Sequence, residues 1–359
     1  MTHQQPSSSQ HVTRPVLESG IPLLKRDATS FQLGLHPSRS VILPAAIATQ
    51  LIALCNGEHA MDDIQRILQP SVSSETNVIA ELFHEMLAKG LIKDSETTTC
   101  SPRSNLADTH MQTAYLHAVN QSAHPDAMLK RLNTELHIHG LGKLGMTVTT
   151  LLASSGFAQI RPHDRTPVNA SDVTTFGAQR CDIGSRREHI ALQIIERVQT
   201  GVTQRNHNMK FPTTSRLDLF FPDAVADYPW IDPTTGQTCV SADTPYLVAN
   251  HAREHALVSA IIQPGQSGCI RCLHLHNADR DPAWPLLSTQ LMGRVTLDKS
   301  PTSLVIQTAL LVIDILHQWA DGHLAARSSI YELAWPNPLP RIRLNPIHQD
   351  CGCDELRVA

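Results

Sequence analysis

Four cysteines in the C-terminal part of the chain have the type and spacing that suit a metal ion. They form two close pairs, Cys269 and Cys272 in the segment CIRC, and Cys351 and Cys353 in the segment CGC. Such pairs are typical of tetrahedral Zn²⁺, and four thiolates leave no open position for water or substrate. The alternative is four unpaired thiols. We expect a structural zinc ion that ties the C-terminal residues to the segment around Cys269 and performs no chemistry.

Three glycines in the middle of the chain have the spacing of a nucleotide-binding loop. Gly140, Gly142 and Gly145 follow the predicted strand 135–139 and precede a helical stretch, and a second predicted strand ends at Asp164. In a nucleotide-binding β-α-β unit, such glycines let backbone N–H groups approach phosphate, and the acid meets a ribose. The pattern indicates this fold. Nucleotide binding itself stays open, because the same glycines also serve packing.

Charged residues near this loop have two alternative roles each. Lys143, inside the loop, reaches a phosphate or is solvated. Arg187 opens a predicted helix that ends at Val198, and it faces phosphate or lies with Arg186 in a solvated first turn. Asp223 follows a predicted strand at 217–221. A carboxylate there lies where open α/β sheets bind ligands, or it caps a helix.

Two polar stretches divide the chain into the parts that position these residues. Residues 1–12 predict a disordered head and residues 96–110 a linker. Between them, residues 13–95 contain short strands followed by helices, which predicts an α+β module. Residues 111–359 alternate strands and helices, with further strands expected at 246–249 and 257–262. This second part predicts an α/β domain around a mostly parallel sheet.

The first module offers a site for a peptide. A short strand at a sheet edge, beside an amphipathic helix, can accept an extended peptide by β-addition. Apolar residues at helical spacing would line the groove, or they form the module's own core. The strand is Ser40, Val41, Ile42 and Leu43, and the groove residues are Ile79, Leu82, Phe83 and Met86.

Composition limits the classes of partner. The chain has 359 residues, 41% hydrophobic, and a net charge of −4, which gives no general attraction to nucleic acid or anionic membrane. The longest apolar run, Leu304–Leu316, is too short to span a bilayer and predicts a buried helix. We expect a cytoplasmic protein with reduced cysteines. The 20 histidines are scattered, and none is assigned as a ligand.

Taken together, these motifs resemble a known family. The order strand, GLGKLG, helix, strand and Asp164, followed by DIGSRREHIA, PGQSGCIRC and the final CGC, is similar to the ThiF and MoeB family of adenylating folds. The block from Pro264 to Leu291, with HQDCGC, resembles the branch of TOMM precursor leader-peptide-binding, or bacteriocin cyclodehydratase, proteins. RPVLESGIPLLKR, FQLGLHPSRSVIL and the helices after them resemble the winged-helix RiPP recognition element.

This resemblance implies a partner protein. In the family, the recognition element binds the leader of a ribosomally made peptide and presents its core to a YcaO-type cyclodehydratase, which uses ATP to convert Cys, Ser or Thr into azolines. Relatives of this fold are commonly dimers, which implies a homodimer here. No catalytic residue is implied in this chain itself.

Departures from the family pattern imply that ATP and Mg²⁺ binding has been lost. Active adenylating relatives carry a lysine where Arg187 stands and an Asp-Asn pair where Asp223 is followed by Ala224. They also carry an Asn and an Arg shortly after the acid that matches Asp164, and these are missing here. Adenylation needs cations at the phosphates and an acid on magnesium. The resemblance thus implies an inactive scaffold.

Two other functions remain open from the sequence. The first is an active ATP-dependent adenylating enzyme of the ThiF/MoeB type, acting on a peptide or a carrier-protein C-terminus. Its ATP and magnesium ligands would be Gly140, Gly142, Gly145, Asp164, Arg187 and Asp223. The second is a dinucleotide-dependent oxidoreductase, which rests on the glycine loop alone and gives the four cysteines no role.

Overall fold

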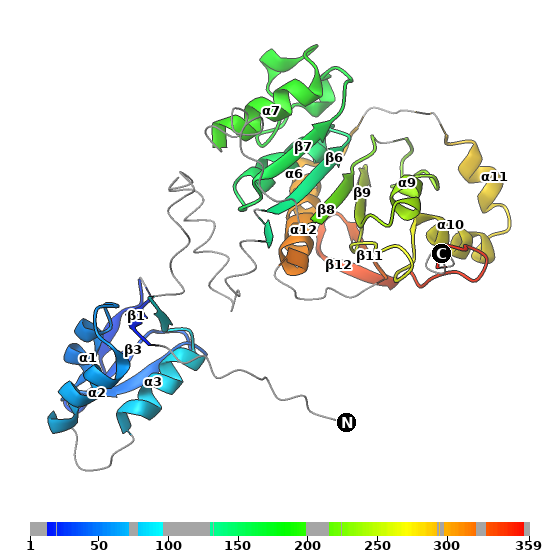
Figure 1. Ribbon diagram of the computed structural model, residues 1–359. Helices are drawn as coiled ribbons and strands as arrows, with labels where there is room; N and C mark the ends of the chain where they lie inside the picture. Colours follow the sequence, from blue (N-terminus) through cyan, green and yellow to red (C-terminus); the bar gives the residue numbers. More distant parts are fainter. Residues whose placement is uncertain are drawn as a thin grey trace. The chain divides into compact units, whose positions relative to one another are not determined.

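The computed structural model describes residues 13–18, 20–71, 78–95, 130–131, 133–198, 215–223, 225–292, 294, 298–320 and 328–354. The chain divides into two compact units, Met1–Asn105 and Leu106–Ala359, and each is described by itself (Figure 1). The predicted head at 1–12 and the predicted linker at 96–110 lie outside the described residues.

The first unit consists of short strands followed by helices. Strands β2, β3 and β4 form an antiparallel sheet in that order, and β1 pairs antiparallel with β5. The bounds are β1 (Pro15–Leu17), β2 (Leu23–Lys25), β3 (Ser30–Leu33), β4 (Val41–Pro44), α1 (Ala48–Leu54), α2 (Met61–Leu68), α3 (Val78–Ala88) and β5 (Ile92–Asp94). The expected order of strands before helices is therefore present, with β5 added after α3.

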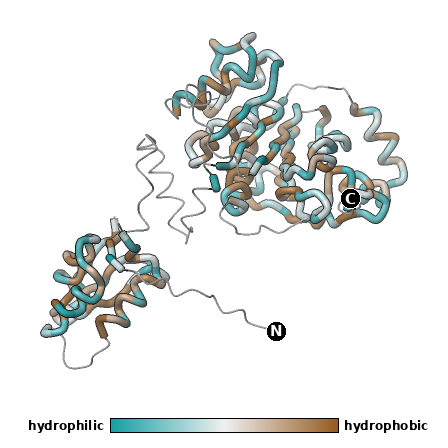
Figure 2. The backbone as a smooth tube through the Cα atoms, in the orientation of Figure 1, coloured by the Kyte–Doolittle hydropathy of each residue, from teal (hydrophilic) through white to brown (hydrophobic). Residues whose placement is uncertain are grey.

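One apolar core holds this unit together. Strand β4 turns Val41 and Leu43 inward and leaves Ile42 exposed, as the two-residue period of a strand requires. Helix α2 buries Ile64 and Leu68, which are four residues apart on one face. Hydrophobic positions are concentrated on the helices and inner strands of this unit in Figure 2. Packing of α3 against α2 and β4 completes the core.

The second unit is built on one sheet of seven strands in the order β12-β11-β10-β9-β8-β6-β7. Strands β7, β6, β8 and β9 are parallel, and β10, β11 and β12 continue the sheet antiparallel. The bounds are β6 (Thr134–His139), β7 (Gln159–His163), β8 (Ser215–Phe220), β9 (Tyr246–Ala252), β10 (His255–Ser259), β11 (Ser329–Ala334) and β12 (Asn337–Leu344). The expected α/β fold with a parallel central sheet is confirmed.

Helices pack on both faces of this sheet. One face packs with α6 and α12 around residues such as Leu136, Ile138 and Leu217. The opposite face of β9 and β10 packs with α9 and α10 around Tyr246. The bounds are α6 (Lys143–Ala153), α7 (Arg187–Val198), α9 (Gln237–Ser241), α10 (Ile270–Arg280), α11 (Trp284–Thr289) and α12 (Thr302–Ala320), with short 3₁₀ turns at Gln69–Ser71, Ala170–Asp172 and Arg180–Asp182.

Helix α12 is the expected buried helix, although it is longer than the apolar run that predicted it. Its length and composition would also suit a membrane span, but half of its apolar window is buried. It packs against α6, β9 and β10. That is the behaviour of a core helix in an α/β domain.

The antiparallel strands correct two expectations. No helix separates β9 from β10, because the two form a hairpin in which Ala252 pairs with His255. Strands β11 and β12 were not expected. The segment NPLPRIRL contains two prolines and two arginines, which mark it as a loop by composition, but pairing with β11 at the sheet edge tolerates both.

Candidate functional site

The glycine loop follows β6 and leads into α6, as the sequence predicts. Gly140 has φ of +86°, which favours glycine, and a side chain there would collide with the carbonyl oxygen of Phe221. A side chain at Gly145 would collide with the carbonyl oxygen of Gly140. Packing alone therefore requires glycine at both positions. At Gly142, a Cβ would lie 2.6 Å from the Asp223 carboxylate, so this position faces charged side chains instead.

Arg187 joins three aspartates at the end of this loop. Its guanidinium forms two hydrogen bonds with Asp172, both of 2.9 Å, and it donates to Asp164 at 3.1 Å and to Asp223 at 3.0 Å. The side chain of Arg187 is 3% exposed. Burial alone would lower its pKa, but Asp223 and Asp172 outweigh that effect and raise it. The structure thus brings Asp164, Arg187 and Asp223 together around Gly142, as the sequence predicts for a site.

Asp164 stabilises the loop itself. Its carboxylate accepts hydrogen bonds from the Leu141 N–H at 2.8 Å and from the N–H and hydroxyl of Thr166 at 2.9 and 2.6 Å. Burial would raise the pKa of Asp164, but these hydrogen bonds and Arg187 outweigh it and lower the pKa. The acid expected to meet a ribose therefore has its oxygen atoms engaged by its own chain.

Lys143 is also paired rather than free. Its ammonium lies 3.0 Å from the carboxylate of Asp298, and it is 10% exposed. His251 lies on the same carboxylate at 3.5 Å and shares a hydrogen bond of 2.9 Å with the Ser300 hydroxyl. Residues from 298 to 300 therefore close over the start of α6.

The space left at the loop is small. A cavity of about 160 Å³ lies between Gly142, Lys143, Arg187, Asp223 and His251. Pockets for ligands of ordinary drug size measure about 300–1,000 Å³. Both cations that line it are neutralised by aspartates, and Asp223 remains 40% exposed. A triphosphate entering here would meet carboxylates before it met an unpaired positive charge.

The four cysteines converge as predicted. Cys269 lies 3.7 Å from Cys272 and 3.5 Å from Cys351, and Cys272 lies 3.6 Å from Cys353, measured between sulfur atoms. All four are buried. A disulfide requires about 2.0 Å, so none of these pairs is bonded. Tetrahedral zinc with Zn–S bonds of about 2.3 Å would hold its sulfurs about 3.8 Å apart, so the cluster can hold such an ion with little rearrangement.

The elements around the cluster explain its geometry. Cys269 is the N-cap residue of α10 and Cys272 lies in its first turn. The C-terminal segment after β12 is held beside them because the Asn345 side chain donates to the carbonyl oxygens of Gly268 and Cys269. The N–H of His348 donates to the Cys272 sulfur at 3.4 Å. A hydrogen bond from the Cys269 thiol lowers the pKa of Cys272, whereas burial raises the pKa of Cys351 and Cys353.

The family model for the ThiF family matches residues 115–353, from before the glycine loop to the last cysteine of the cluster. This match covers more than half of the chain. The protein belongs to the ThiF family. A search of curated proteins finds no match.

Solved structures share the fold of this ThiF-family chain at low sequence identity. The microcin C7 biosynthetic enzyme MccB in complex with N-formylated MccA is 14% identical, with a TM-score of 0.64, covering 95% of this chain and 99% of that chain. E. coli MccB with ATP is 13% identical, also with a TM-score of 0.64, covering 94% and 99%. The heterocyclase TruD is 13% identical, with a TM-score of 0.56, covering 95% of this chain and 42% of TruD.

The predicted peptide residues fall into two groups in the first unit. Strand β4 is the last strand in the sheet order β2-β3-β4, so it lies at an edge as expected. The helix residues, however, belong to the core: Ile79, Leu82, Phe83 and Met86 are between 0 and 9% exposed. Of the two roles that the sequence left open for these four residues, lining a peptide groove or forming the module's own core, they have the second. On β4 itself, Ile42 is 52% exposed, whereas Val41 and Leu43 are buried.

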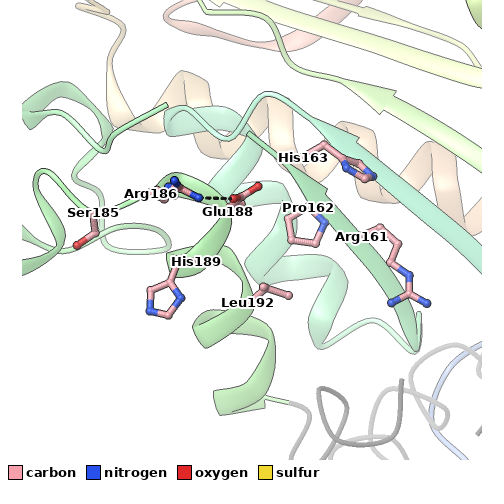
Figure 3. A pocket seen from close by; sticks show the side chains of 8 residues that line it. All are labelled: Arg161, Pro162, His163, Ser185, Arg186, Glu188, His189 and Leu192. Atoms are coloured by element: carbon pink, nitrogen blue, oxygen red, sulfur yellow. Dashed lines mark ion pairs between the residues drawn. The ribbon is translucent and has the colours of Figure 1, made fainter. Parts of the chain in front are cut away.

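A larger cavity of about 570 Å³ lies away from the glycine loop, between β7 and α7. Arg161, Pro162 and His163 of β7 line one side, and the other side comes from the start of α7, where Arg186 lies 3.7 Å from Glu188 (Figure 3). Arg161 and His163 extend from the same side of the edge strand in this view. No sequence pattern indicates this cavity, because it depends on how α7 returns to the sheet.

Proposed function

We propose that this chain binds the leader of a ribosomally made precursor peptide through its first unit and presents the peptide to a YcaO-type cyclodehydratase. The first unit, residues 13–95, acts as a winged-helix recognition element, joined by the linker 96–110 to the ThiF-family unit. The second unit serves as a scaffold that does not adenylate. Azoline formation, with its ATP, takes place on the partner.

The open edge of β4 carries the proposal for peptide binding. The N–H of Ala45 donates to the carbonyl oxygen of Thr29, and Leu43 is the partner of Phe31. Because hydrogen-bonded pairs alternate in an antiparallel ladder, the N–H and C=O of Ile42 point away from β3, to the free edge. An extended peptide can therefore pair with Ile42 and contact its exposed side chain.

Contacts beside β4 define one end of its free edge. The ammonium of Lys89 donates to the carbonyl oxygen of Ser40 at 2.8 Å, and the Arg39 guanidinium donates to the carbonyl oxygen of Gly90 at 2.7 Å. These contacts tie the start of β4 to the end of α3. Peptide pairing would then begin at Ile42 and run toward Pro44, which has no N–H to donate.

Support from relatives agrees with this proposal. Solved structures that cover both units of this chain include MccB with the peptide MccA and the heterocyclase TruD. A peptide precursor is thus a partner of one protein with this fold. The proposal extends this kind of partner, a precursor peptide, to the present chain and assigns its binding site to β4.

The pairing of the cations supports a scaffold role for the second unit. Arg187 contacts three aspartates and Lys143 contacts Asp298. The proposal also assigns Zn²⁺ to the four cysteines, where it would hold the C-terminal segment against α10. Its chemistry there is structural, because all four ligand positions are thiolates.

The same proposal includes a homodimer. Strand β12 is the outermost strand of the large sheet, and Leu339, Ile342 and Leu344 on it are 62 to 73% exposed. Apolar residues at an open strand edge are typical of surfaces that associate.

Peptide titration tests the proposal. A candidate precursor is a short Cys/Ser/Thr-rich reading frame located beside the gene for this chain. A fluorescent peptide with the leader sequence of such a candidate is titrated with full-length protein by anisotropy. We expect Ile42→Glu to weaken binding about tenfold or more, since charge replaces an apolar contact at the edge. Ile42→Pro should weaken it similarly by removing the outward N–H.

Ile67→Glu is the matched control, since Ile67 on α2 is an isoleucine of similar exposure, 41% against 52% for Ile42. It should bind like the unmodified chain. Failure of the folded full-length protein to bind the leader, or equal loss in both glutamate variants, would contradict the proposal.

A second candidate function is ATP-dependent adenylation of a peptide or carrier-protein C-terminus. The observation that favours it is the Asp223 carboxylate, which is 40% exposed beside Gly142 just past the C-terminal end of β8. An acid in that place can hold magnesium on a bound nucleotide.

A further inference from the structure

Three histidines from adjacent strands meet on one face of the large sheet. Strand β6 turns Leu136 and Ile138 into the core and leaves His137 and His139 on the opposite, half-buried face. Parallel pairing places His163 of β7 beside His139, and Asp218 of β8 beside His137. The histidines that are scattered in the sequence are thus gathered by strand register.

Ligand atoms of His137, His139 and Asp218 are close enough to share one ion. His137 Nδ1 lies 2.9 Å from His163 Nε2, and His139 Nε2 lies 2.7 Å from Asp218 Oδ1. One ligand atom each from His137, His139 and Asp218 lie within 4.8 Å of one another. The rings of His137 and His163 are 5.0 Å apart and within 15° of parallel, so with such a short N···N distance they meet edge to edge.

We propose that His137, His139 and Asp218, with His163 beside them, form a second divalent metal site, distinct from the cysteine cluster and built from nitrogen and oxygen ligands. Such a donor set suits Zn²⁺, Co²⁺ or Ni²⁺. Ligand atoms on a tetrahedral ion with bonds of about 2.0–2.1 Å lie about 3.3 Å apart. Each of the two close pairs would open by about half an ångström for the ion to replace the hydrogen bond. The other ligand atoms, which lie within 4.8 Å of one another, would move closer by up to about 1.5 Å.

The charge around the cluster permits a cation. Arg216 donates to both oxygens of Asp218, to Oδ2 at 2.8 Å and to Oδ1 at 2.9 Å, so that Oδ1 is shared between Arg216 and His139. Glu135 is paired with Arg161 at 2.9 Å. The charges of these two carboxylates and two guanidiniums cancel, so the affinity for a divalent cation depends mainly on the imidazoles.

Residues around the cluster orient the proposed ligands, and the cluster is accessible from solvent. Arg216 fixes the Asp218 carboxylate in the way that outer partners orient metal ligands. His139 is 33% exposed, and His163 lines the cavity between β7 and α7 shown in Figure 3. Solvent therefore reaches the cluster without unfolding of the strands.

Both metal sites lie on the same face of the sheet. Phe220 of β8 packs against the His139 ring at 4.6 Å and meets Tyr246 edge-on at 6.1 Å. Tyr246 belongs to the same apolar cluster as the four cysteines. Two aromatic rings thus separate a thiolate site from an imidazole site, and the two can be distinguished by their ligands.

Metal analysis of full-length protein tests the proposal. Protein stripped of metal, reloaded with Zn²⁺ and dialysed should hold about two equivalents, and the double variant His137→Gln/His139→Gln about one. With Co²⁺, that variant should keep the thiolate charge-transfer bands of the cysteine site. Cys351→Ser should lose those bands but keep the imidazole-bound ion.

His189→Gln is the control, because His189 lines the same cavity outside the cluster. It should keep about two equivalents. The proposal is overturned if the unmodified chain holds one equivalent only, or if the double histidine variant, folded by circular dichroism, binds as much metal as the unmodified chain. A single His139→Gln variant repeats the measurement with less disturbance of β6, and it should bind the second ion more weakly.

Discussion

Arg187 decides the chemistry at the glycine loop. The sequence located this arginine correctly at the start of α7, but it left open whether the side chain faces phosphate or solvent. The structure gives neither outcome, since Arg187 is buried among Asp164, Asp172 and Asp223. Asp172 was not anticipated, because nothing in the local pattern of its segment marks a partner 15 residues later in the chain.

Replacing this arginine should destabilise the second unit strongly. Arg187→Met leaves three carboxylates without their shared cation, two of them buried, and breaking such a group costs about 3–5 kcal/mol of unfolding free energy. Arg186→Met is the control, since Arg186 is 71% exposed, and it should change stability by less than about 0.5 kcal/mol. Urea unfolding followed by tryptophan fluorescence reports this unit alone, because all the tryptophans lie in it: Trp230, Trp284, Trp319 and Trp335. Equal losses in both variants would contradict a central role for Arg187.

The stability contributed by Asp164 should depend on pH. Its pKa in the folded chain lies below the ordinary value of 3.8, so the folded state binds fewer protons than the unfolded state as pH falls through that value. Asp164→Asn should therefore cost about 1.5–3 kcal/mol at pH 7, the usual worth of hydrogen bonds to a charged group. The difference from the unmodified chain should shrink below about pH 4. A difference that stays constant from pH 7 to pH 3 would rule out this account.

At the scale of elements, periodic sequence patterns predicted the helices, whose formation depends on local sequence. They did not predict strands or clusters that form only through pairing with a distant strand. Helix α2, Met61–Leu68, lies in the part of the first module where helices are expected after the strands, and its buried residues Ile64 and Leu68 repeat with helical spacing. Strand β12 was not predicted, because prolines and arginines are not typical of strands. The segment forms a strand through its antiparallel pairing with β11. The imidazole cluster was missed in the same way. The alternation His137-Ile138-His139 placed two rings on one face, but His163 and Asp218 join them only through strand register.

The link between α10 and the C-terminal segment should depend on zinc. Cys351→Ser removes one ligand of the four, so we expect loss of the bound zinc and of about 3 kcal/mol or more of stability, which lowers Tm by about 6–12 °C. Cys181→Ser is the matched control, since Cys181 is exposed and outside the cluster, and it should leave metal content and Tm unchanged. Strong chelator should bring the unmodified chain close to the variant. A wild type that is stable and free of zinc would refute the structural role.

At the scale of the whole molecule, the proposed function assigns a different role to each unit. The first unit has its own core and an open strand edge, whereas the second has a nucleotide-binding fold whose cations are already paired. A family assignment alone does not separate a scaffold from an enzyme, because both keep the glycines that packing requires at Gly140 and Gly145. The state of Arg187 and Lys143 is what favours the scaffold.

Nucleotide binding by the full chain discriminates between the two candidate functions. With Lys143 and Arg187 held by aspartates, we expect no leader-dependent exchange of pyrophosphate into ATP. A nucleotide present at one hundred times its Kd would stabilise the fold by about 2.7 kcal/mol and would raise Tm by several degrees. Because both cations at the loop are paired, we expect magnesium-ATP at millimolar concentration not to bind and to raise Tm by less than about 1 °C. Leader binding by the same preparation shows that the protein is competent. If exchange is observed and is abolished by Asp223→Ala, which leaves leader binding intact, then the carboxylate beside Gly142 holds magnesium and the chain is an adenylating enzyme.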